Sequence, residues 1–270
     1  MKLFVIACLV LAASSAHANP RPLPFSYPYE TLLADKLEIE QYVDLVPVRV
    51  ARENPDGTLE GVWALRSELQ TEIEYGLTDK IEVGWYFAFE QGASDGTPFL
   101  KFSGVKQRAR MRFAEAGEWP VDVGVYLELA ESYDELEVEE KLLVSRRFGD
   151  FNATVNLWIE QEYYWQTGDT KYIYNPTAGV SYEVSPKLIV GVEYWGRGRF
   201  DDATDATDMT GETEAPPGAR HYLGPTVLAQ SGHVFLSFGA YARLDKLGSG
   251  IAPGDAFGKL WFRTVLGIEL

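Results

Sequence analysis

Apolar and polar side chains alternate at every second position in twelve stretches of this chain. The clearest of them is residues 80–90, where Ile81, Val83 and Trp85 are separated by Glu82 and Gly84. Side chains two positions apart lie on the same face of a β-strand, so each stretch has one apolar and one polar face. Only residues 76–79 separate this stretch from the preceding one at 65–75, which predicts a β-hairpin.

The connections between the stretches are short and long in turn. They are short after the even-numbered stretches and mostly longer after the odd-numbered ones, with residues 131–134 as the exception. An even number of strands places both ends of the chain on one side, the periplasmic side in single-chain barrels. The twelve predicted strands are residues 37–45, 65–75, 80–90, 99–113, 121–130, 135–148, 152–162, 172–184, 187–198, 221–228, 234–244 and 259–270.

Strands of about ten tilted residues match the thickness of a bilayer core. Inside a bilayer every backbone N–H and C=O group needs a partner, so a sheet spans it only when it closes without a free edge. A soluble β-sandwich shows the same alternation, but it seldom sustains a dozen strands of this length with one-sided connections. The pattern therefore predicts an all-β fold, a 12-stranded antiparallel transmembrane up-and-down β-barrel.

The start of the chain has the order of a secretory signal peptide: Lys2, an apolar run and the small residues of Ala16-His17-Ala18. We predict that residues 1–18 are removed by cleavage after Ala18 and that the mature protein lies in the bacterial outer membrane. Cys8, the only cysteine, is in the removed segment, so the mature chain has no thiol for a disulfide or a metal.

Two segments remain after this cleavage. Residues 37–270 hold all twelve predicted strands and are expected to form the barrel. Residues 19–36 are rich in proline and are expected to be a periplasmic leader. The sequence leaves open whether this leader plugs the barrel from below or hangs free.

The net charge of the chain argues against one class of partner, nucleic acid. The chain has 40 acidic and 24 basic residues, a net charge of −16, which argues against nucleic-acid binding. The partners expected of an outer-membrane barrel are membrane lipid and lipopolysaccharide, the barrel-insertion machinery and a small-molecule solute. No cofactor motif is present, and neither is a P-loop or an H-E-x-x-H zinc motif.

Opposite charges gather on the polar faces of three neighbouring predicted strands and are expected to meet in the lumen. They form either a permeation path with a transverse field or a salt-bridged interior that fills a small barrel, and the sequence does not decide between the two. These lumen charge rows are Glu68, Glu72, Glu74, Glu82 and Glu90 on one side and Lys106, Arg108, Arg110 and Arg112 on the other.

Glycines recur on the same polar face, among them Gly179 and Gly191. We predict a structural role, in which they either relieve crowding in the lumen or let an aromatic ring lie over the backbone. Aromatic residues near strand ends on the apolar face are expected to form the two girdles at the membrane surfaces. The predicted girdle residues are Tyr75, Phe89, Phe113, Phe148, Tyr182, Tyr194, Tyr222 and Phe262.

The longest connection, residues 199–220, is acidic and is predicted to be a solvated extracellular loop. It lacks the glycine and the terminal glutamate of an EF-hand loop, so no metal site is predicted, although shared divalent ions at the lipopolysaccharide surface stay open. Its carboxylates are Asp201, Asp202, Asp205, Asp208, Glu212 and Glu214.

The positions of the histidines bear on whether the protein is a serine hydrolase, because such an enzyme needs a base beside its nucleophile, usually histidine. The mature chain has only His221 and His233, and the predicted topology places them at opposite ends of the barrel. Neither histidine is followed two positions later by serine, as in the twelve-stranded outer-membrane phospholipase. We therefore predict no catalytic residues and no enzyme activity.

With these strands placed, the chain resembles the outer-membrane barrels of the phenol-degradation "MetA-pathway" type. The resemblance is carried by residues 73–84, in which Tyr75-Gly76 ends a strand and Leu77-Thr78-Asp79 forms the turn, and by residues 179–187 and 222–226. It implies an uptake channel for small compounds, aromatic ones among them, and it brings no catalytic residues.

The leading hypothesis is therefore an outer-membrane channel or passive transporter for small solutes, in which the lumen charge rows set the charge preference. The alternative is a closed structural or adhesive barrel whose acidic extracellular loop meets an external partner.

Overall fold

The computed structural model describes residues 19–94, 97–200, 219–253, 255 and 257–270. The predicted signal peptide with Cys8, and the acidic residues 201–218 with the six carboxylates named above, lie outside the described residues. The strands are β1 (Leu37–Glu53), β2 (Leu59–Thr78), β3 (Ile81–Ser94), β4 (Thr97–Arg112), β5 (Asp122–Glu131), β6 (Glu135–Phe148), β7 (Phe151–Tyr164), β8 (Thr170–Tyr174), β9 (Thr177–Ser185), β10 (Leu188–Arg199), β11 (Arg220–Ser231), β12 (Val234–Arg243) and β13 (Leu260–Glu269), with a 3₁₀ turn at Leu244–Lys246.

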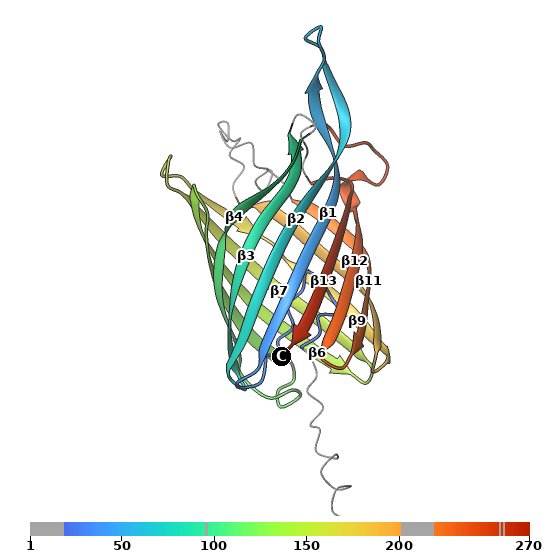
Figure 1. The fold of residues 1–270 in the computed structure, drawn as a ribbon. Coiled ribbons are helices and arrows are strands. Elements are labelled where there is room, and N and C mark those ends of the chain that lie inside the picture. Colours follow the sequence, from blue (N-terminus) through green and yellow to red (C-terminus); the bar gives the residue numbers. More distant parts are fainter. Residues whose placement is uncertain (1–18, 95–96, 201–218, 254, 256) are drawn as a thin grey trace, which may run out of the picture.

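These strands follow one another antiparallel around a closed barrel (Figure 1). The barrel closes where β1 pairs with β13, from Glu38 opposite Glu269 to Leu45 opposite Phe262. This pairing leaves no free edge along the joint, as a membrane-spanning sheet requires. The predicted barrel is confirmed.

The wall has the predicted twelve strand positions, because β8 and β9 together occupy one of them. Both pair with β7 and with β10, and Asn175 and Pro176 lie between them. Pro176 has no N–H to give to the ladder. The neighbouring groups still keep it continuous, since the Asn175 amide donates to the Trp158 carbonyl and the Gly196 amide to the Pro176 carbonyl, both at 3.0 Å.

The period-two pattern separates lipid-facing from lumen-facing side chains. In β5, Tyr126 and Glu128 are buried in the lumen, whereas Leu127 and Leu129 are exposed on the outer wall. The same alternation along the other strands surrounds the barrel with apolar side chains and encloses the charged ones. Among the described residues, no helix is both long and apolar enough to cross a bilayer.

The first two strands are longer than the predicted ranges 37–45 and 65–75, because β1 continues to Glu53 and β2 begins at Leu59. β1 and β2 stay paired from Leu37 opposite Tyr75 to Glu53 opposite Leu59, and they rise above the rim as a two-stranded arm (Figure 1). Alternation alone underestimated the strands because the arm leaves the membrane and carries polar side chains on both faces. A turn with Gly57 at φ 80° closes its tip.

Both ends of the barrel segment lie together, as predicted. The Leu270 amide donates to the Leu37 carbonyl at 2.8 Å, which ties the end of β13 to the start of β1. The tight turns at this end use glycine in the left-handed region, with Gly149 and Gly232 both at φ 61°. A side chain is strained in this conformation, so glycine suits such short connections.

Candidate functional site

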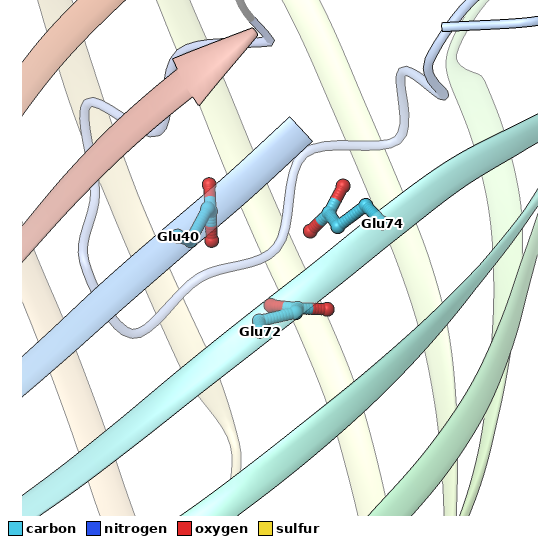
Figure 2. A group of neighbouring side chains, drawn as sticks. All are labelled: Glu40, Glu72 and Glu74. Carbon is cyan, nitrogen blue, oxygen red and sulfur yellow. The ribbon is translucent and has the colours of Figure 1, made fainter. Parts of the chain in front are cut away.

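The leader, residues 19–36, lies inside the barrel. Half of its side chains are buried, among them Arg21, Leu23, Phe25 and Tyr29. Figure 2 shows this segment running beside the inward-pointing carboxylates of Glu40 on β1 and of Glu72 and Glu74 on β2. The question that the sequence left open is answered: the leader enters the lumen.

The leader forms no strand of its own. Backbone bonds with Gly76 of β2 hold its end at Asp35 and Lys36, and side chains of the lumen wall satisfy the backbone of its middle part. The Glu193 carboxylate of β10 accepts the amides of Phe25 at 3.1 Å and Ser26 at 2.7 Å. The Asn156 side chain of β7 accepts the Tyr27 amide at 2.6 Å and donates to the Tyr27 carbonyl at 3.1 Å. Backbone groups that leave water need such partners, so these two wall residues fix the middle of the leader.

Its composition suits this position. Prolines at 20, 22, 24 and 28 have no N–H groups, which reduces the number of donors that the lumen must satisfy. Burial raises the pKa of Glu30 above its ordinary value, because the charged carboxylate loses water.

Small wall residues make room for the leader. A Cβ atom added at Gly179 would lie 2.7 Å from Leu23 Cδ1, and one at Gly191 would lie 3.2 Å from Leu23 Cδ2. At Gly76, it would lie 2.0 Å from the Leu33 carbonyl oxygen. At Gly179 and Gly191 this agrees with the prediction that lumen glycines relieve crowding. The leader is the nearest group at Gly179, whereas at Gly191 the Thr226 hydroxyl, at 2.7 Å, lies closer than the leader.

Five of the predicted charge-row residues meet in one network beside the leader. Arg108 Nε donates to Glu72 at 2.5 Å, its Nη1 donates to Glu82 at 2.6 Å, and it also pairs with Glu74. Arg110 pairs with Glu82 at 2.6 Å, and its Nη1 donates to the Pro28 carbonyl of the leader at 3.2 Å.

Leader and wall add three more residues to this network. Arg21 of the leader pairs with Glu40 at 3.4 Å and donates to the Tyr42 hydroxyl, which in turn donates to Glu72 at 2.8 Å. The Asn19 amide donates to Glu38 at 2.9 Å. We call these eight charged residues the buried ion network: Glu38, Glu40, Glu72, Glu74, Glu82, Arg21, Arg108 and Arg110.

The other predicted row residues lie elsewhere. Lys106 pairs with Glu128 at 3.0 Å and with Glu139 at 3.6 Å. Arg112 donates to the Asp79 carbonyl and pairs with Glu115 near the end of β4. Glu68 pairs with Arg66 at 3.2 Å and lies opposite Glu90 in the β2–β3 ladder.

Among the described residues, carboxylates gather closely enough at three places to ligate a metal. Oxygens of Glu40, Glu72 and Glu74 lie within 4.8 Å of one another, and so do those of Glu128, Glu137 and Glu139 and those of Glu137, Glu160 and Glu162. Protein cations already contact each group. Arg21 and Arg108 contact the first group, and Lys106 contacts the second. Arg197 contacts the third group, at 2.6 Å from Glu160. These ion pairs account for the clustering.

A cavity of about 350 Å³ lies beside the leader, between the barrel walls. Phe25 of the leader forms part of its lining and stacks on Trp195 of β10, with ring centroids 4.4 Å apart. Trp158 and Trp261 also line this space, together with charged residues such as Lys106 and Glu139. The cavity therefore combines aromatic surface with charge.

The aromatic packing corrects one girdle prediction. Tyr222 is fully buried, stacks on Trp195 at 4.2 Å and donates to the Gly258 carbonyl at 3.0 Å. The sequence pattern placed Tyr222 on the lipid-facing side of its strand. It points into the lumen instead, because its ring has a stacking partner there and its hydroxyl has an acceptor there.

The two histidines lie on different elements. His221 on β11 contacts the Tyr194 hydroxyl at 2.7 Å through Nδ1. His233 lies in the turn between β11 and β12, with Nδ1 3.9 Å from Glu269. β11 separates them along the wall, as the sequence predicted.

No protein-family model matches the chain, and no curated protein matches it. Solved structures do. The NanC porin is 9% identical, with a TM-score of 0.56 over 87% of this chain and 100% of the porin. An outer membrane channel from Pseudomonas putida F1 is 11% identical, with a TM-score of 0.55 over 90% of this chain and 98% of the channel. At these identities the similarity establishes the fold, which is that of outer-membrane β-barrels.

Proposed function

We propose that this protein is an outer-membrane channel for small solutes, closed at rest by its own N-terminal leader. The observation that carries the proposal is the cavity of about 350 Å³, lined in part by the leader, in a barrel with an apolar outer wall. In this proposal the signal peptide is removed after Ala18, the barrel-insertion machinery places the barrel, and lipid and lipopolysaccharide surround it.

The favoured solutes are small and planar, aromatic compounds among them. The cavity volume lies at the lower end of the range of small-molecule sites, and the rings of Phe25, Trp158, Trp195 and Trp261 supply flat apolar surface. The resemblance to barrels of the phenol-degradation "MetA-pathway" type points to the same class of solute.

The first experiment is solute flux into liposomes, together with single-channel recording in planar bilayers. We expect a closed baseline with brief openings as the leader moves. A barrel that inserts fully but shows neither conductance nor flux would instead support the alternative, a closed structural or adhesive barrel, for which the projecting β1–β2 arm offers an external surface.

We propose that the residues that line the cavity set the preference of the channel for cations or anions. Its lining has five carboxylates and four cations, so we expect a mild preference for cations. Within the predicted rows, Glu68 and Lys106 line it, whereas Arg108 and Arg110 are almost fully buried in ion pairs. We propose that these two arginines shape the wall and that Glu68 contributes to selectivity.

Replacing Glu68 with lysine should shift the reversal potential in a salt gradient toward anions, because two units of charge change beside the cavity. Glu60→Lys is the matched control, since Glu60 lies on the exposed arm in a pair with Arg52. If both variants shift the potential equally, or neither does, then Glu68 is outside the conduction path.

Locking the leader should hold the channel closed. The hydroxyls of Ser26 in the leader and Thr177 on β9 are 2.9 Å apart, so the side chains at these two positions point toward each other, and cysteine sulfurs there would have to approach to about 2.05 Å to form a disulfide. The double variant Ser26→Cys/Thr177→Cys should lose conductance on oxidation and regain it on reduction. Each single variant, treated in the same way, should respond to neither reagent. If conductance persists after the disulfide is verified, then movement of the leader does not gate the channel.

A further inference from the structure

The first residue of the predicted mature chain contacts a buried acid. The Asn19 nitrogen donates to Glu38 Oε2 at 2.9 Å. Glu38 is 0% exposed, and its other oxygen, Oε1, is buried without a hydrogen-bond partner among the described residues. One carboxylate oxygen therefore lacks a donor at the point where the leader begins.

The buried ion network is also short of positive charge. Its five carboxylates are 0–2% exposed, and its three arginines are 2–3% exposed. Figure 2 shows how closely three of these carboxylates approach one another, with oxygens within 4.8 Å. Buried charges are costly unless they are paired, so a further cation at this place would stabilise the closed state.

We propose that cleavage after Ala18 itself supplies this cation, so that the new α-ammonium of Asn19 pairs with Glu38 and holds the leader inside the barrel. Hydrolysis adds one water across the Ala18–Asn19 peptide bond, leaving a carboxylate on Ala18 and an ammonium on Asn19. The amide before cleavage has one N–H to give, whereas the ammonium has three donors and a positive charge. It keeps the bond to Glu38 Oε2 and has two further donors for Oε1. This inference rests on the proposed processing site, and it couples removal of the signal peptide to closure of the channel.

The test compares three mature proteins purified from the outer membrane, with the N-terminus of each established by intact mass. The first begins at Asn19, the second carries Glu38→Gln, and the third has one glycine before Asn19. The third variant changes no buried side chain, so it keeps the test valid if Glu38→Gln folds poorly. Glu68→Gln is the matched control, because Glu68 lies on the same wall but pairs with Arg66.

The measurement is the rate at which an amine-acylating reagent labels the α-amino group of the folded barrel near neutral pH. Pairing with Glu38 raises the pKa of an ammonium, and one unit of pKa lowers the reactive fraction about tenfold. We expect the protein that begins at Asn19 to react about tenfold more slowly than the Glu38→Gln and glycine-extended proteins, and at the same rate as Glu68→Gln. In bilayers, the two disrupted proteins should stay open for a larger fraction of time.

Two results overturn the inference: a native N-terminus at a residue other than Asn19, or equal labelling rates in all four proteins. The labelling does not depend on conduction. Slow labelling of the amine in a barrel that never conducts would therefore support the inference and reject the proposed channel function. Fast labelling of the amine in a conducting barrel would reject the inference and support the channel function.

Discussion

Deletion of residues 20–31 from the mature chain is expected to raise single-channel conductance several-fold. These residues include Phe25, which lines the cavity, and Arg21, which pairs with the wall. Glu193 and Asn156 would lose their leader partners but keep the wall hydroxyls of Tyr241 and Thr177. They would face a wet lumen and bind water, so the barrel wall should remain intact. Conductance in planar bilayers measures the effect.

The control for this deletion keeps the length of the leader but replaces residues 20–31 with glycine and serine. This segment lacks the ring of Phe25 and the charge of Arg21, so it should also leave the channel open. Circular dichroism establishes that each barrel is folded. If the deleted protein is folded and conducts like the full chain, then the leader does not obstruct the path.

Arg108→Met is expected to cause the largest loss of stability of any single substitution in the lumen wall. Arg108 contacts Glu72, Glu82 and Glu74, and all of these side chains are at most 3% exposed. Removing the cation leaves buried carboxylates that cannot reach water. Breaking a buried ion pair in this way costs about 3–5 kcal/mol. Urea unfolding in lipid vesicles, followed by tryptophan fluorescence, measures the change.

Arg52→Met is the matched control. Arg52 pairs with Glu60 at 3.2 Å on the exposed arm, where both side chains are more than half exposed. Exposed pairs contribute about 0–1 kcal/mol, so this variant should unfold near the wild-type urea concentration. Equal stability of Arg108→Met and Arg52→Met would mean that the network tolerates the loss, for instance by taking up protons.

The barrel was predictable from the sequence because lipid imposes one rule on every strand. Each position that faces hydrocarbon must be apolar, so a period of two marks the strands even though the mean hydropathy, −0.15, is unremarkable. The rule stops at the membrane surface, which is why the predicted strands end at residue 45 and begin again only at residue 65, and the arm between them was missed. It also hides the break at Pro176, since the pattern resumes in phase.

The contacts among neighbouring strands were predictable in part. Glu72, Glu74, Glu82, Arg108 and Arg110 lie on β2, β3 and β4, so adjacency alone brings them together. The leader contacts were not predictable, because Phe25 and Glu193 are 168 positions apart and no periodicity relates them. The glycines at 179 and 191 were the available signal, since they mark wall positions where something bulky lies.

The leader precedes β1 and joins the barrel only at its C-terminal end, near Lys36. The proposed cleavage after Ala18 gives this segment one free end, so it can withdraw and return without threading any loop and without breaking a ladder bond between β1 and β13. Closure of the barrel and insertion of the leader are thus topologically independent, and the chain can close the barrel before the leader enters it.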